Sequence, residues 1–220
     1  MPSKAALEAT IANEKKKIID ENRMKKISKL VEKLIKNEFS TSSRFTTAKV
    51  ENITTFDRNE IVFGRVLGRG GFGIVNDIQS IKLLGDFKCS DEHKKNRRIM
   101  QENTTRSIYV VKNIQQRCRY DVKQCYQALL DLVVETYILA AISHQNIIKL
   151  CAIRDGDIFS PRYFIVLERL DETLERRIYN DWKKKKESIF FRGKYKKIFQ
   201  QQLLCCLELS TAIEYLHSNK

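Results

Sequence analysis

A glycine cluster between two short β-type runs constrains the fold of this chain more than any other feature. The segment LGRGGFGIV places Gly68, Gly70 and Gly73 in a G-x-G-x-x-G arrangement. Glycine lets backbone amides come close to phosphate oxygens, so the pattern is typical of nucleotide-binding loops. Because the run that follows, GIVNDIQSIKLL, is typical of a strand and not of a helix, we expect a hairpin and disfavour a dinucleotide-binding fold. A plain glycine-rich hairpin turn is the alternative interpretation.

Two charged residues further along the chain occupy positions where apolar residues are expected. The run SIYVVKN predicts a strand that carries Lys112, and residues 121–143 predict a long helix. Glu135 lies within the apolar stripe of that helix, whose members recur at steps of three and four: Ala128, Leu132, Glu135, Leu139 and Ile142. A carboxylate on a buried face needs a cationic partner, so we expect Lys112 to meet Glu135. The alternative is a lysine reaching solvent and a slightly mis-phased helix face.

Taken in this order, the glycine loop, the strand lysine, the helix glutamate and the segments SHQNIIKL and YFIVLERLDETL resemble the small lobe of the eukaryotic protein kinases. The resemblance spans residues 63–220. It implies an α+β fold with a five-stranded antiparallel sheet and one regulatory helix, followed by the first helices of an incomplete large lobe. The motif residues His144, Asn146 and Ile147 would follow the regulatory helix, with no catalytic role for the histidine.

The resemblance also implies a site for ATP. Gly68, Gly70 and Gly73 would cover the phosphates, Lys112 would hold the α- and β-phosphates, and Glu135 would orient Lys112. The remaining nucleotide-binding positions are Val75, Val110, Leu167 at the gatekeeper position, and the hinge residues Glu168 and Leu170. Val110 stands where the family usually has alanine, so we expect extra bulk above the adenine.

The last stretch, LELSTAIEYLHSNK, resembles the helix that precedes the family's catalytic loop. The H-R-D-type loop and the D-F-G motif, which carry the base and the Mg²⁺ ligands, do not occur in the 220 residues. We therefore expect an incomplete catalytic domain that is inactive on its own and has no metal ligands. The resemblance implies phosphoryl transfer to protein Ser or Thr hydroxyls in a complete enzyme. A kinase-derived, non-catalytic binding or regulatory module is the alternative.

Changes in composition divide the chain into three parts. Residues 1–55 combine a basic amphipathic helix, with Met24, Ile27, Val31, Leu34 and Ile35 at helical spacing, and a Ser/Thr-rich linker at 40–47. Residues 56–170 form the expected small lobe, with a polar insertion at about 85–106 that we expect to be a solvated loop. Residues 171–220 begin the large lobe. Their last helix carries an apolar stripe that we expect to be partly exposed: Phe199, Leu203, Cys206, Leu209, Ile213 and Leu216.

The formal net charge of +14 raises the question of nucleic-acid binding. The basic residues are spread over the amino-terminal arm, the run 94–98 and the run 183–197. Because no nucleic-acid-binding motif accompanies them, we disfavour that role. The last of these runs interleaves lysines with Trp182, Phe190, Phe191 and Tyr195 and could dock an acidic partner; a solvated insertion is the preferred alternative.

Without an export signal or an apolar span, we expect a soluble intracellular protein, cytoplasmic or nuclear. The six cysteines show no metal-ligand spacing.

Overall fold

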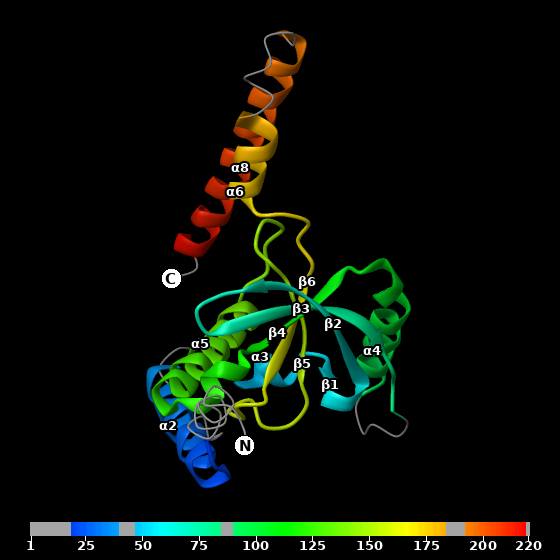
Figure 1. The fold of residues 1–220 in the computed structure, drawn as a ribbon. Helices are drawn as coiled ribbons and strands as arrows, with labels where there is room; N and C mark the ends of the chain where they lie inside the picture. The colour runs from blue at the N-terminus through cyan, green and yellow to red at the C-terminus, as the bar shows by residue number, and fades with distance from the viewer. Residues whose placement is uncertain (1–18, 40–46, 85–89, 184–191, 219–220) are drawn as a thin grey trace, which may run out of the picture.

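The computed structural model describes residues 19–39, 47–84, 90–183 and 192–218. Within these residues the chain is an α+β protein, in which helices cover a mixed sheet of six strands (Figure 1). The strands are β1 (Thr55–Phe56), β2 (Ile61–Arg69), β3 (Gly73–Ile81), β4 (Tyr109–Ile114), β5 (Leu150–Arg154) and β6 (Phe164–Glu168). Their order across the sheet is β1-β5-β6-β4-β3-β2.

The expectation of a five-stranded antiparallel sheet was incomplete. Neighbouring strands from β5 to β2 are antiparallel, but β1 adds a sixth strand parallel to β5, with Thr55 opposite Ile153 and Phe56 opposite Arg154. Phe56 is fully buried in an apolar cluster that also contains Val111 of β4 and Phe164 of β6. Two residues are too short for an alternating pattern to be recognised, which is why the sequence does not reveal this strand.

The long helix predicted for residues 121–143 is confirmed as α5 (Val122–Ala141). Asp121 caps it, because its carboxylate accepts a hydrogen bond from the Gln124 amide at 2.7 Å. The buried side of α5, which includes Leu129, Val133 and Tyr137, packs on the sheet in one cluster with Val110, Ile165 and Leu167. This helix therefore fixes the position of Glu135 relative to β4.

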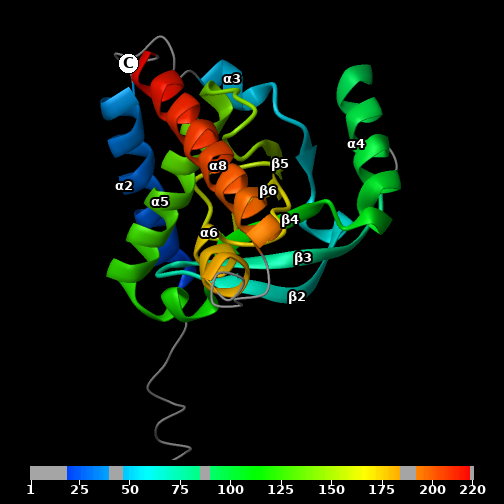
Figure 2. The same ribbon diagram turned by 90° about the horizontal axis from the view of Figure 1, so that it is seen from above.

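The basic amphipathic helix is present as α2 (Glu21–Phe39), and its apolar face is part of the same core. Ile27, Val31 and Ile35 are buried against α5, whereas Leu34 is exposed. Figures 1 and 2 both place α2 beside α5. The expected linker lies outside the described residues except for Thr47, which begins the short helix α3 (Thr47–Glu51).

The polar insertion does not form a solvated loop, and this prediction was wrong for residues 91–103. They form α4 (Asp91–Asn103), followed by the 3-10 turn η2 (Thr104–Arg106), on the side of the sheet away from α5 (Figure 2). Arg97 and Met100 on α4 are buried. Arg97 can be buried because it forms an ion pair with buried Glu60 of the 3-10 turn η1 (Arg58–Glu60). A local sequence pattern does not reveal a partner so far away in the chain.

The carboxy-terminal part consists of α6 (Leu174–Arg176), a π-helical turn η4 (Arg177–Lys183) and the long helix α8 (Arg192–Ser218). The apolar stripe of α8 is exposed as expected, including Phe199, Leu203 and Ile213. Within the helices that the structure describes, none combines the length and apolar character required to cross a bilayer. Trp182 is buried. Phe190, Phe191 and the Tyr195 side chain lie outside the described part of the chain, so the interpretation of the basic run 183–197 as a docking segment or a solvated insertion stays a prediction.

Candidate functional site

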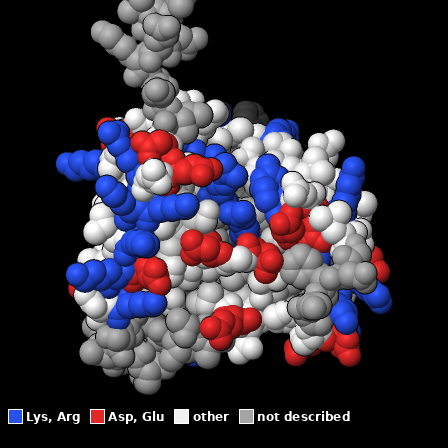
Figure 3. Space-filling view, turned by 90° about the horizontal axis from the view of Figure 1, so that it is seen from below, with Lys and Arg blue, Asp and Glu red and all other residues white. Residues whose placement is uncertain are grey.

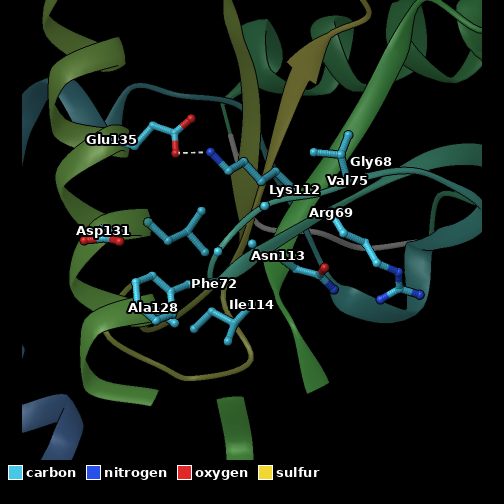
Figure 4. Close-up of a pocket in the computed structure, with 14 residues that line it drawn as sticks. Gly68, Arg69, Phe72, Val75, Lys112, Asn113, Ile114, Ala128, Asp131 and Glu135 are labelled. Carbon is cyan, nitrogen blue, oxygen red and sulfur yellow. Dashed lines mark hydrogen bonds and ion pairs between the residues drawn. The ribbon is translucent and has the colours of Figure 1, made fainter. Parts of the chain in front are cut away.

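A cavity of about 450 Å³ lies beneath the glycine-rich hairpin turn, between β3, β4 and α5 (Figure 4). Six of the residues predicted from sequence line it: Gly68, Gly70, Gly73, Val75, Lys112 and Glu135. Three separate stretches of chain supply them: the hairpin of β2 and β3, the strand β4 and the helix α5. The sheet register then fixes their neighbours: Val75 is opposite Lys112, and Gly73 is opposite Ile114.

Lys112 and Glu135 meet in the middle of this cavity. Lys112 Nζ donates to Glu135 Oε2 at 2.5 Å, and each side chain is 29% exposed. Figure 4 shows the two side chains converging from β4 and α5. The expected pairing is therefore present, with both groups half-buried, so that they remain accessible from the cavity.

The cavity has an apolar end and a charged end. Phe72, Ile114, Ala128 and Leu132 line the apolar end, where Figure 4 shows Phe72 close to Ala128. Asp131 also lines the cavity, and its Oδ1 accepts a hydrogen bond from Gln127 at 2.7 Å. The charged residues that line the cavity are the cations Arg69 and Lys112 and the carboxylates Asp131 and Glu135. A counter-cation bound with an anion would reduce its repulsion by the two carboxylates.

The glycines of the turn contribute to this site because they lack a side chain, and not because they adopt unusual backbone angles. No residue of the turn 68–73 has a positive φ, which among the described glycines occurs only at Gly156. A Cβ added at Gly73 would come within 3.2 Å of Lys112 Cε, whereas one added at Gly68 or Gly71 would meet nothing within 4 Å. Gly73 thus permits the close approach of Lys112, and the surroundings of Gly68 and Gly71 stay open.

Side chains from the segment after β4 hold the glycine turn from below, a feature that the sequence analysis did not identify. Gln115, which is 4% exposed, donates from Nε2 to the carbonyl oxygens of Gly70, at 2.5 Å, and Gly73, at 3.0 Å. Its backbone N–H donates to the Phe72 carbonyl at 2.9 Å. Arg117, in the 3-10 turn η3 (Gln116–Tyr120), donates to the Gly71 carbonyl at 2.7 Å. Together with a weaker bond from Cys118 Sγ to the Phe72 carbonyl at 3.7 Å, these four bonds fix the turn. Gln115 and Arg117 could not be identified from the sequence, because hydrogen bonds between a side chain and a distant loop carbonyl produce no periodic pattern.

The other predicted nucleotide-binding positions do not line this cavity. Val110 and Leu167 are opposite each other on β4 and β6 and are almost fully buried in the core. Val110 is two residues before Lys112 on β4, so both point to the same face of the sheet. The side chain of Leu170 is 63% exposed.

Glu168 has a structural contact of its own. Its carboxylate Oε1 accepts from the Lys149 amide at 2.9 Å, and its own N–H donates to the Lys149 carbonyl at 3.1 Å. These bonds tie the end of β6 to β5. The cavity thus brings together the residues predicted to contact phosphates, whereas Val110 and Leu167, predicted to contact adenine, lie on a filled part of the sheet face that carries Lys112.

The motif residues after α5 contact α8 instead of the cavity. The His144 ring stacks on Tyr215 with ring centroids 5.0 Å apart, and Asn146 Nδ2 donates to the Glu208 carbonyl at 3.1 Å and to Thr211 Oγ1 at 3.0 Å. Tyr215 also accepts a hydrogen bond from the Ser143 amide at 3.0 Å. These contacts attach α8 to the connection between α5 and β5.

Two comparisons of the sequence with known proteins gave no match. No model of a protein family matches the chain, and no curated protein sequence matches it either.

Proposed function

We propose that this chain is the nucleotide-binding small lobe of a protein-kinase-like protein, and that its cavity binds the phosphates of Mg-ATP. The observation that carries the proposal is the Lys112–Glu135 pair beneath a glycine-rich turn. A lysine oriented by a helix carboxylate holds nucleotide phosphates in protein kinases. The order of elements supports the same proposal, because the glycine hairpin, lysine strand, glutamate helix and hinge strand follow one another along the chain.

In this proposal each residue type has a separate task. The open surroundings of Gly68 and Gly71 give phosphate oxygens access to backbone amides. Lys112 supplies positive charge, while Glu135 holds the ammonium group in place. Mg²⁺ bound to the phosphates would offset the two carboxylates of the cavity, Asp131 and Glu135. The adenine would lie along the sheet face beyond Val75, towards Val110 and Leu167, which have to yield space.

The experiment is a titration of the full chain with Mg-ATP by isothermal titration calorimetry. We expect saturable binding by the unaltered chain and binding at least about tenfold weaker for Lys112→Met, a loss of about 1.4 kcal/mol. Lys123→Met is the matched control, because Lys123 is an exposed lysine on α5 that does not line the cavity. Equal affinities for the two variants, or no binding by the unaltered chain, would refute the proposal.

A non-catalytic, kinase-derived binding module is the second candidate. Two observations favour it: Phe72 and the buried Val110 reduce the space for a nucleotide, and the 220 residues contain no H-R-D or D-F-G motif. The Mg-ATP titration distinguishes the two candidates, because a module without space for the nucleotide would show no saturable binding. A phosphotransfer assay with [γ-³²P]ATP tests the lack of catalysis that both candidates share. For this chain alone we expect ATP binding without phosphotransfer above the Lys112→Met background. Phosphotransfer above that background would contradict the assignment of an incomplete catalytic domain.

A further inference from the structure

Four arginines come together where β5 and the β5–β6 connection approach η1 and η3. Arg58 belongs to η1, Arg119 to η3, Arg154 is the last residue of β5, and Arg162 precedes β6. Figure 3 shows one face of the molecule, on which Lys and Arg side chains lie with Asp and Glu side chains among them. The four residues come from positions up to about 100 apart in sequence, so the fold has brought these like charges together.

Within the part of the chain that the structure describes, none of these four arginines forms a salt bridge. Two acids close to them in sequence are engaged with the backbone: Asp57 Oδ1 accepts from the Asn59 amide at 2.8 Å, and Asp157 Oδ1 accepts from the Phe159 amide at 2.9 Å. Asp57 still acts on Arg58 through its charge. The positive charge of the cluster is therefore only partly balanced.

The guanidinium groups perturb one another. Burial lowers the pKa of Arg119, and the positive charges of Arg162, Arg58 and Arg154 lower it further. Burial and the charge of Arg154 also lower the pKa of Arg58. Such mutual effects require proximity, because the interaction of charges in solvent weakens rapidly with distance.

The cluster also contains hydrogen-bond donors that have no acceptor. The Nε atoms of Arg119 and Arg154 are buried and make no hydrogen bond to the described residues. An unsatisfied buried N–H is costly, and a native structure normally supplies it with a partner. An anion placed between these side chains would satisfy both the donors and the charge.

Contacts hold two of the four guanidinium groups, those of Arg58 and Arg154, in place. Arg154 Nη1 donates to Ser160 Oγ at 3.3 Å, and the same oxygen accepts from the Arg162 amide at 3.2 Å. Arg58 Nη1 donates to the Ile61 carbonyl at 2.9 Å, and its guanidinium lies 3.8 Å from the centroid of the Phe63 ring. Arginines fixed in this way lose less entropy on binding a ligand than the solvated lysines of α2 would lose.

We infer that Arg58, Arg119, Arg154 and Arg162 form a binding site for a phosphoryl group, separate from the cavity beneath the glycine turn. The planar guanidinium fork matches the oxygens of phosphate in a bidentate geometry, which favours this ligand over a single carboxylate or chloride. The group is carried either by free phosphate or by a phosphorylated side chain of a protein. This inference does not depend on the proposed nucleotide site.

The test is a calorimetric titration of the full chain with inorganic phosphate at constant ionic strength. We expect saturable binding that weakens at least tenfold in Arg154→Gln/Arg162→Gln. The matched control is Lys25→Gln/Lys29→Gln, which removes two positive charges from exposed positions on α2 and should leave the affinity within about twofold. The same tenfold loss is expected when Arg154→Gln/Arg162→Gln is added to Lys112→Met, which distinguishes this site from the nucleotide cavity. A loss that disappears in the Lys112→Met chain would assign the phosphate to that cavity and overturn the inference.

A second arm identifies the source of the phosphoryl group. A neutral peptide with one phosphoserine is compared with inorganic phosphate and with the unphosphorylated peptide. Tenfold tighter binding of the phosphopeptide assigns the site to a phosphorylated protein segment, and equal binding assigns it to free phosphate. If the double variant fails to fold, Arg162→Gln replaces it, because that side chain is exposed. The inference is overturned if neither ligand binds, or if the arginine variant and the lysine control bind phosphate equally.

Discussion

Glu60 and Glu135 each meet a cation from a distant part of the chain, yet the two ion pairs differ in burial and in hydrogen bonding. The Glu60 side chain is 0% exposed and that of its partner Arg97 is 4% exposed, compared with 29% for both Glu135 and Lys112. Glu60 also accepts from the backbone amides of Asp57, at 2.9 Å, and Leu84, at 2.8 Å.

Arg97 is satisfied in the same way as its partner. Its Nη1 donates to the Thr55 carbonyl at 2.6 Å, and its guanidinium lies 5.0 Å from the centroid of the Phe56 ring. Lys112 has no hydrogen-bond acceptor other than Glu135 among the described residues. A fully satisfied pair closed to solvent has a structural role, whereas a pair with spare donors facing a cavity is available to a ligand.

The largest effect that separates the two pairs is expected for Arg97→Met. The substitution leaves the Glu60 carboxylate buried without its cation, so the free energy of unfolding should fall by about 3 to 5 kcal/mol. Urea denaturation of the full chain measures this change. Arg98→Met, on the exposed side of α4, is the control and should change stability by less than about 0.5 kcal/mol. A similar small change in both variants would contradict the structural role of the Glu60–Arg97 pair.

An intermediate effect is expected at the support of the glycine turn. Gln115→Ala removes the two hydrogen bonds from Nε2 to the turn and should lower the free energy of unfolding by about 1 kcal/mol. Hydrogen exchange of the amides of residues 69–73 should become faster, while exchange in α4 should not change. Gln116→Ala, at an exposed neighbouring position, is the control. Unchanged exchange in the turn would show that Gln115 does not hold it.

The smallest effect on stability is expected for Glu135→Gln. Because both partners are partly solvated, loss of this pair should lower the free energy of unfolding by less than about 1 kcal/mol. The same urea measurement as for Arg97→Met provides a direct comparison of the two pairs. A loss of 3 kcal/mol or more would mean that Glu135, like Glu60, serves mainly to hold the fold together.

The contrast between the pairs also explains what sequence could predict. Lys112 and Glu135 stand out because each interrupts a regular apolar pattern, one on a strand and one on a helix face. Arg97 lies in a polar run and Glu60 in a turn, so neither is unusual locally, and their pairing depends on a fold that brings together residues 37 apart. The same limitation hides the two-residue strand β1 and the contacts of Gln115.

The positions predicted to contact adenine illustrate a further limit of prediction from sequence. Val110 and Leu167 lie on the expected strands, and Val110 shares its sheet face with Lys112. Whether space exists beside them depends on side-chain packing, and in this structure both are nearly buried. Strand position is encoded in local pattern, whereas the volume left between side chains is decided by residues from several elements.

A double-mutant cycle on Lys112 and Glu135, measured as the Kd for Mg-ATP, tests the central claim most directly. If the two residues act as one phosphate-binding unit, Lys112→Met and Glu135→Gln should each weaken binding about tenfold, and the double variant should be no weaker than Lys112→Met alone. Losses that add to about a hundredfold in the double variant would mean that the two side chains act independently, which would contradict the account.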